Sequence, residues 1–228
     1  MRNILVSTLL ILLSLVLGAQ SNGYGLRLGS GISTQKWQGG DQRSPLLTYH
    51  VDFFMDSESE GGNIFYGALG YHQRGSSVRF FRFVDQLGNV YPGGSFALRF
   101  HQVGLEIGIK KAKSIKYWKL AYGIGLRGEY TIKSDLELFQ EYKDYVKKFN
   151  YGFTICGSAE TKLNKFIALG FEIRASPDVS RQIYVPAAIP WYDPYTNSSR
   201  PGYEQSIRNL GFEASLYLRF IQLIQYIE

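Results

Sequence analysis

The chain has little of what most sites of known chemistry need. Among its 228 residues there is one cysteine, Cys156, which excludes an internal disulfide and a cysteine-rich metal site. The three histidines, His50, His72 and His101, show neither H-x-x-x-H nor H-E-x-x-H spacing, and no Ser/His/Asp or Cys/His arrangement stands out. We therefore expect no cofactor, no metal site and no enzymatic activity.

Long hydrophobic runs are missing from the body of the chain. No run of about eighteen apolar residues occurs after the first 20 positions, which excludes a helical membrane span there. A membrane β-barrel remains open, because its signal per segment is much weaker than that of a helix. The basic excess, a formal net charge of +6, is scattered and not clustered, so we expect no nucleic-acid partner.

Residues 1–19 have the composition of a leader. One positive charge precedes an apolar run that ends at Leu17, and two small residues follow. This pattern is typical of a secretory signal peptide cut before Gln20, with a short N-terminal anchor helix as the alternative. We expect a signal peptide over 1–19, a single barrel domain over 20–228, and export to the bacterial outer membrane.

The clearest positive signal is the stretch Trp118–Ile132, WKLAYGIGLRGEYTI. Its even positions are apolar apart from Gly128, and its odd positions hold small residues together with Lys119, Arg127 and Glu129. Because successive side chains of a strand point to opposite faces, this alternation predicts one long strand with two unlike faces. Aromatic residues at both ends of the apolar face favour contact with lipid on that side.

Seven other segments repeat this division between an apolar face and a small-or-charged face. They are Tyr24–Ser33, Leu47–Met55, Phe65–Arg74, Val103–Lys110, Tyr151–Lys162, Ile167–Arg174 and Leu210–Phe220. Long and short connections alternate between the strands, and all seven prolines fall outside them, as expected for strands paired on both sides. The predicted fold is an all-β, eight-stranded antiparallel up-and-down transmembrane β-barrel.

Two local irregularities can be predicted within this barrel. The apolar side chains of Leu98 and Phe100 have the opposite parity to the outward residues that follow His101, which predicts a β-bulge near His101. The faces of the sixth and seventh strands match only across a loop of odd length. Residues 163–165 satisfy this as a three-residue turn with its second or third residue in the left-handed conformation.

Two patterns imitate functional sites. Residues 123–128 match G-x-G-x-x-G, but a dinucleotide site needs a helix after this motif, and here the strand alternation continues to Ile132. His50 and His72 fall on the inner faces of neighbouring strands. With 57–61 as the turn, the register sets them about three residues, or roughly 10 Å, apart along the strand, which disfavours a metal site.

Charged side chains occupy the predicted inner face. The residues of this network are Arg27, Asp52, Arg74, Glu106, Arg127, Glu129, Glu160, Glu172, Arg174, Glu213 and Arg219, with Lys110, Lys119 and Lys162 on the same face. An eight-stranded barrel is just wide enough to be filled by side chains, and charges inside it must pair or meet water. We expect a structural ion-pair network that fills the lumen; the alternatives are a proton or ion path, or a carboxylate pair in acid–base chemistry.

The last long loop, residues 176–208, is the best place to look for specific function. It has five prolines and a set of amphipathic aromatic residues that could form a contact surface: Tyr184, Trp191, Tyr192, Tyr195 and Tyr203. The alternative is a loop that folds over the barrel mouth or lies in lipopolysaccharide headgroups. The loop 133–149 could either hold a short amphipathic helix or extend its hairpin.

The chain resembles the PorT-like outer-membrane β-barrel family of Bacteroidetes-type bacteria. The resemblance rests on YGLRLGSGIST, ALGYHQRGS, YGIGLRGEY, ASPDVSRQ and LGFEASLYLRF, which together span nearly the whole chain after the leader. It implies an eight-stranded outer-membrane barrel, without established activity for most members and with a secretion-system role for the namesake. One departure is that IQLIQYIE follows Phe220, where the terminal aromatic residue of such barrels is expected.

We expect an integral outer-membrane barrel without a catalytic site, with a structural or interaction role through its extracellular loops. Its partners would be outer-membrane lipid and lipopolysaccharide, the barrel-assembly machinery during biogenesis, and an extracellular or envelope protein. Two alternatives are kept: a secretion-system component or outer-membrane enzyme, and a soluble lipocalin-like barrel with its apolar face inside.

Overall fold

The computed structural model describes residues 21–38, 43–80, 83–84, 90–137, 139–187, 191–193, 198–200 and 204–223. The predicted signal peptide lies outside the described residues. Among the residues described, no helix is long and apolar enough to cross a membrane.

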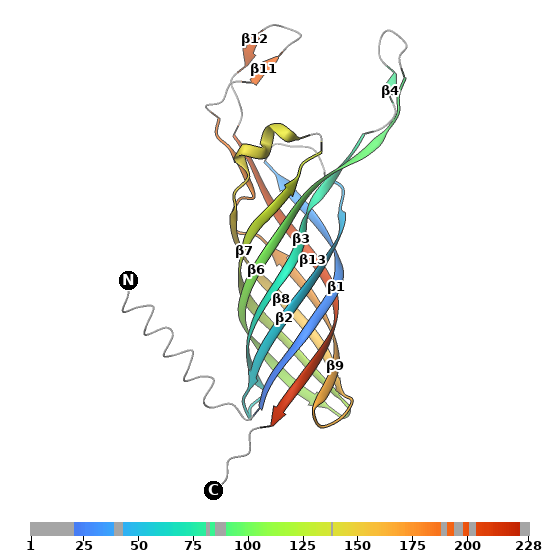
Figure 1. Ribbon diagram of the computed structural model, residues 1–228, viewed down its shortest axis with the longest axis vertical. Helices are drawn as coiled ribbons and strands as arrows, with labels where there is room; N and C mark the ends of the chain where they lie inside the picture. Colours follow the sequence, from blue (N-terminus) through green and yellow to red (C-terminus); the bar gives the residue numbers. More distant parts are fainter. Residues whose placement is uncertain are drawn as a thin grey trace, which may run out of the picture.

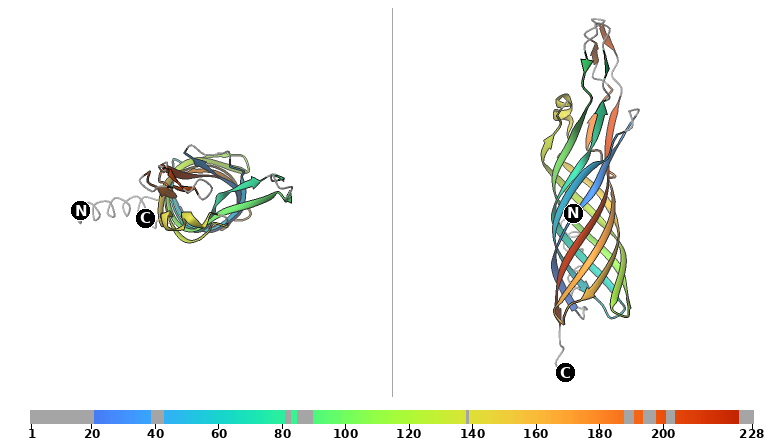
Figure 2. Two further views of the ribbon diagram at one scale, coloured as in Figure 1. Left: turned by 90° about the horizontal axis from the view of Figure 1, so that it is seen from above. Right: turned by 90° about the vertical axis from the view of Figure 1, so that its right-hand side faces the viewer.

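Eight long antiparallel strands form a closed, tilted barrel (Figure 1). They are β1 (Ser21–Trp37), β2 (Leu46–Glu58), β3 (Asn63–Phe80), β6 (Gly94–Ile115), β7 (Trp118–Asp135), β8 (Phe149–Lys162), β9 (Ile167–Pro177) and β13 (Gln205–Leu223). Each pairs with the next along the chain, and β1 pairs with β13 from Ser21↔Leu223 to Trp37↔Ile207, which closes the ring seen from above in Figure 2. The predicted eight-stranded up-and-down barrel is confirmed.

The two ends of the barrel differ. At the short-turn end lie the β2–β3, β6–β7 and β8–β9 hairpins, together with the first residue of β1 and the last residue of β13. At the opposite, long-loop end lie the remaining elements (Figure 1): β4 (Phe83–Val84), β5 (Val90–Tyr91), the 3-10 helix η1 (Gln140–Tyr145), β10 (Ile183–Val185), β11 (Trp191–Asp193) and β12 (Ser198–Arg200). Both readings of the loop 133–149 hold in part, because β7 continues to Asp135 before η1 begins.

The two faces of the strands are divided as the alternation predicts. Outward side chains are exposed in every strand, reaching 75% for Leu47 and 68% for Leu126, while the inward Asp52 is 1% exposed. Apolar side chains with this exposure all around a barrel match the lipid-facing band of a membrane barrel. The lipocalin-like alternative requires the apolar face inside, and is therefore wrong.

An apolar cluster fills the barrel at the long-loop end. Its buried members come from β1, β6, β10, β13 and the segment after β7: Trp37, Leu98, Phe100, Leu136, Ile183 and Ile207. Phe139 and Tyr142 pack against it from η1 and the residue before it, with ring centroids 5.9 and 5.8 Å from Trp37. Burial here raises the pKa of Tyr142, so its hydroxyl stays neutral. This cap cluster gives the strands above the apolar band a core of their own.

The irregularity near His101 is confirmed, but its predicted cause is wrong. His101 pairs with Lys133 and Gln102 with Thr131, so the extra residue is Ile132 on β7. The parity of β6 does not change: Leu98 and Phe100 are fully buried and point inward, on the same side as Gln102. Apolar residues beyond the lipid need a core away from water, and the cap cluster supplies it.

Two turns differ from the predicted ones. The connection after the predicted strand Val103–Lys110 is shorter than expected, because β6 continues to Ile115 and only Lys116 and Tyr117 connect it to β7. Between β8 and β9 the loop is odd, as predicted, but a bond of 2.9 Å from Leu163 N to Ile167 O encloses residues 164–166. No residue there has positive φ; the Asn164 side chain instead accepts two backbone N–H groups.

Candidate functional site

The inner faces of all eight long strands carry the predicted charged side chains into one interior cluster. All eleven residues of the predicted network are at most 6% exposed. Alternate positions of a strand share a face, so charges on eight strands converge on the barrel axis. Of the three lysines expected beside them, Lys110 and Lys119 enter ion pairs, whereas Lys162 is exposed at the short-turn end.

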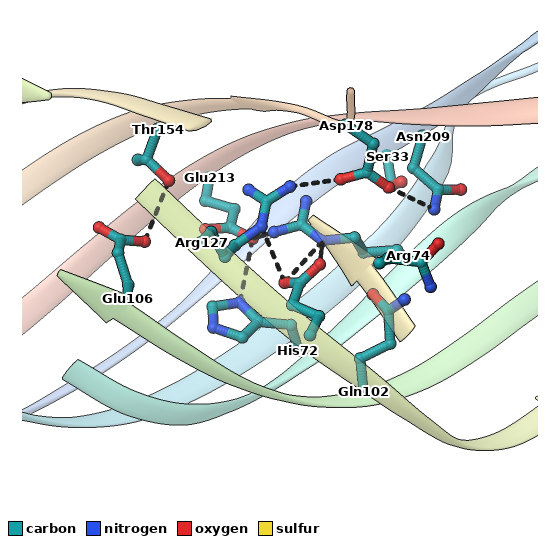
Figure 3. Close-up of polar contacts among 12 residues, drawn as sticks. Ser33, His72, Arg74, Gln102, Glu106, Arg127, Thr154, Asp178, Asn209 and Glu213 are labelled. Atoms are coloured by element: carbon teal, nitrogen blue, oxygen red, sulfur yellow. Dashed lines mark hydrogen bonds and ion pairs between the residues drawn. The ribbon is translucent and has the colours of Figure 1, made fainter. Parts of the chain in front are cut away.

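Figure 3 labels Arg74, Arg127 and Asp178 of the layer nearest the cap cluster. This layer centres on Glu129. Its carboxylate accepts hydrogen bonds of 3.1 and 3.2 Å from Arg74 Nε and lies 3.2 Å from Arg127 Nε. Arg127 also contacts Asp178, which accepts a 2.9 Å bond from Asn209 Nδ2. Two guanidinium groups and two carboxylates thus neutralise each other immediately below the apolar cap.

The middle layer is organised by Arg174 and His72. Arg174 contacts Glu106 and lies 3.4 Å from Asp52 and 3.6 Å from Glu213. His72 bridges two of the same carboxylates: Nε2 is 2.9 Å from Asp52 and Nδ1 is 3.3 Å from Glu213. Each of these carboxylates therefore has more than one cationic or donor neighbour, which buried charge requires.

A further layer connects the middle of the barrel to the short-turn end. Arg27 donates a 2.8 Å bond to Asp52 and contacts Glu172, which Lys110 also contacts. Tyr66 Oη donates a 2.6 Å bond to Glu106. The same carboxylates therefore link one layer of charges to the next.

The last ion pairs lie around Arg219, at the mouth of the short-turn end. Arg219 donates to Asp56 at 2.6 and 2.9 Å and lies 3.4 Å from Glu160. Lys119 pairs with Glu58 at 2.5 Å. The charged interior is therefore continuous from Asp178 to this mouth.

His50 and His72 correct the predicted register. They are direct cross-strand partners, with stacked rings 5.7 Å apart, and are not offset by three residues. The reason is the turn: β2 continues to Glu58, so the hairpin closes later than predicted and the register moves. Among the described residues no group of three His, Cys, Asp or Glu side chains is arranged to hold a metal ion.

Sequence reasoning missed several partners in the network. Asp56, Glu58 and Asp178 were not assigned to it, although Asp56 and Glu58 continue the inward parity of Asp52 on β2. This parity would have identified both residues, but the predicted strand Leu47–Met55 ends before them. Asp178 follows the end of β9, and local sheet pairing brings it against Arg127, because Gly152 of β8 is the cross-strand partner of both.

A small cavity lies among the charged side chains of the interior. Toward the short-turn end a cavity of about 30 Å³ is lined by residues that include Arg27, Tyr66, Glu172, Tyr217 and Arg219. This volume holds one or two water molecules, which need polar partners of this kind. Each acid of the predicted network has a cationic neighbour, so the arrangement favours fixed ion pairs over proton transfer to a substrate.

The predicted loop surface is described only in part. Tyr184 lies on β10 with Arg181 over its ring at 4.5 Å. Trp191 and Tyr192 lie on β11, which pairs with β12. Tyr195 and Tyr203 lie outside the described residues, so the five aromatic residues are not brought together in the described part of the chain.

No known family model matches the chain, and no curated protein matches it. Among solved structures it is similar to the outer membrane protein OprG from Pseudomonas aeruginosa, with a TM-score of 0.50 and 9% identity over 89% of this chain and 97% of OprG. Neisserial surface protein A gives a TM-score of 0.44 and 7% identity over 89% and 97% of the two chains. The outer membrane protease OmpT from Escherichia coli gives 0.42 and 9% over 90% and 97%. The chain therefore has the fold of small outer-membrane β-barrel proteins.

Proposed function

We propose that this protein is an integral outer-membrane barrel that conducts neither ions nor small molecules and acts through its long-loop end. The proposal rests on one observation: the same strands have two unlike faces. The outer face is apolar and exposed around the ring, and the inner face is charged and buried in ion pairs. Lipid is the solvent that suits such an outer face.

The orientation follows from the connections. Membrane barrels of this type have short turns on the periplasmic side and long loops outside. The short-turn end is therefore periplasmic and the long-loop end extracellular, after export by the signal peptide at 1–19. Outer-membrane lipid and lipopolysaccharide surround the barrel, and the barrel-assembly machinery inserts it.

The closed lumen is the second part of the proposal. Two barriers support it: the ion-pair network, and above it the cap cluster, whose Leu98 and Phe100 side chains are fully buried. The apolar side chains of the cap cluster oppose the passage of ions, because an unpaired charge among them loses its hydration. The same burial keeps the carboxylates from substrate, which supports a role without catalysis.

The long-loop end would carry the specific interaction. The short strands β4, β5, β11 and β12 extend beyond the barrel there (Figure 1), where an extracellular or envelope protein could contact them. The described members of the proposed contact surface are Tyr184 on β10 and Trp191 and Tyr192 on β11. We also propose that the chain belongs to the PorT-like family, on the sequence motifs that it shares with that family. The alternative role is that of a secretion-system component or outer-membrane enzyme.

Conductance measured together with folding tests this function. The purified protein is inserted into planar bilayers, and its folded state is followed by heat-modifiable migration on a detergent gel. The proposal expects a heat-modifiable band and no stable conductance steps. Steady single-channel currents from the heat-modifiable form would contradict the closed lumen, and a protein that stays in aqueous buffer without detergent would contradict the barrel in the membrane.

A further inference from the structure

The β6–β7 hairpin carries an unusual combination of groups at the short-turn end. The outward stripe of β6 is apolar as far as Ile109 and then changes to Lys111 and Lys113. On β7 the outward stripe remains apolar to its first residue, Trp118, which is 53% exposed. Lysines beside aromatic residues at the end of an apolar band are typical of the membrane interface.

A groove of about 410 Å³ adjoins the tip of this hairpin. Lys116, Tyr117 and Trp118 line it from the hairpin, and Thr161 and Lys162 line it from the end of β8. Trp118 and Thr161 are cross-strand partners, which brings the two segments side by side. The groove thus joins the lumen mouth to the lipid-facing surface across a rim of aromatic side chains.

The charges of this groove are not balanced. Its two acids are already engaged, Glu58 by Lys119 and Glu160 by Arg219. Within the described part of the chain, Lys116 and Lys162 form neither an ion pair nor a side-chain hydrogen bond, and both are exposed. Two cations without partners beside Tyr117, which is 85% exposed, make a site for an anion attached to an apolar body.

We propose that this groove binds the headgroup of an anionic phospholipid of the inner leaflet. Lys116 and Lys162 would contact the phosphate, and the acyl chains would lie along Trp118, Leu120 and Tyr122 on the outer face. A free phosphate ion would use the lysines but not these side chains, so the apolar stripe favours the lipid. The inference rests on the proposed insertion in the outer membrane.

Retention of lipid by the intact barrel tests the site. The protein is purified in mild detergent, mixed with equal amounts of phosphatidylglycerol and phosphatidylethanolamine, and analysed by native mass spectrometry. The wild type should retain phosphatidylglycerol in preference. K116Q/K162Q should lose about thirtyfold in apparent affinity, since each of the two lysines near a lipid headgroup contributes about 1 kcal/mol. The matched control, K36Q/K148Q, removes the same charge at the other end and should behave as wild type.

Each other outcome overturns the inference. Equal retention of phosphatidylglycerol by K116Q/K162Q and the wild type shows that the lysines do not bind it. Displacement of the lipid by millimolar inorganic phosphate shows a site for a free anion. Heat-modifiable migration is measured on the same samples: a barrel that is folded in detergent but has no lipid preference contradicts this inference alone, whereas a chain that stays monodisperse without detergent contradicts the proposed function.

Discussion

His50 and His72 face each other across β2 and β3 with their rings 11° from parallel, yet they have different surroundings. His72 lies between Asp52 and Glu213, with one ring nitrogen close to each carboxylate. His50 has one partner, the Ser215 hydroxyl at 2.9 Å, and its Nδ1 has none. The two stacked rings therefore contribute to stability in different ways.

Replacing each histidine by phenylalanine should separate these contributions. His72→Phe removes one partner from each of two buried carboxylates, Asp52 and Glu213, and should lower the free energy of unfolding by about 3 kcal/mol. His50→Phe removes one hydrogen bond to a hydroxyl and should cost about 1 kcal/mol. Urea unfolding in lipid vesicles measures both. Equal losses would contradict the unequal roles of the two rings.

Among the described residues, Arg174 is the cation with the most acidic neighbours, so its removal should be the most damaging change in the interior. Arg174→Met leaves the buried Glu106 without its ion-pair partner and removes one cation from Asp52 and from Glu213, and should cost about 3–5 kcal/mol. The exposed pair of Lys133 with Asp135 is the control, since Lys133→Met should change stability by less than about 1 kcal/mol. If both variants unfold at the same urea concentration, the network does not hold the barrel together.

Two glycines provide a matched pair for the packing of the interior. A Cβ on Gly170 would lie 2.1 Å from the ring of its cross-strand partner Tyr217, whereas a Cβ on the outward Gly157 would meet only Ile173, at 3.9 Å. Gly170→Ala should therefore cost about 1–3 kcal/mol, and Gly157→Ala should be tolerated. The midpoint of urea unfolding is the readout. Tolerance of alanine at position 170 would mean that Tyr217 does not fill the lumen there.

The cap cluster should behave as a core rather than as a lipid-facing surface. Phe100→Ala opens a cavity among fully buried side chains and should cost about 3–5 kcal/mol. Leu105→Ala removes a side chain that is 59% exposed on the same strand, and should have a clearly smaller effect. Thermal or urea unfolding of both variants in lipid vesicles measures the two losses of stability. A larger loss of stability in Leu105→Ala than in Phe100→Ala would contradict this, because it would mean that the outward face of β6 is the better packed one.

The barrel could be predicted from the sequence because the alternation of apolar with small or charged residues is periodic. Alternation over Trp118–Ile132 and its seven counterparts determines which face is inside, whatever the register. Turns and registers depend on one or two residues instead. The hairpin after Glu58 closes later than predicted, and that alone moved His50 from three residues away to directly opposite His72.

Alternation alone does not show where the apolar band ends, and this explains why Leu98 and Phe100 led to the prediction of a bulge in β6. An apolar residue on a membrane barrel is expected outside, but this holds only within the lipid. Beyond the band, where η1 and β10 contribute to the cap cluster, apolar residues belong inside. The partners of individual ions could not be predicted either, because the contact of Asp178 with Arg127 depends on the register in which both residues pair with Gly152 of β8.

The central claim is that the apolar outer face lies in lipid, and site-directed spin labelling tests it most directly. Labels are placed singly at Leu105, Ile124 and Phe171 in a Cys156→Ser background, with Lys133 as the position above the band. The account predicts that oxygen, which concentrates in lipid, relaxes the first three labels more than a water-soluble nickel chelate does, and that the order is reversed at Lys133. Stronger relaxation by the nickel chelate at Leu105, Ile124 and Phe171 would show that this face meets water, and would contradict the account.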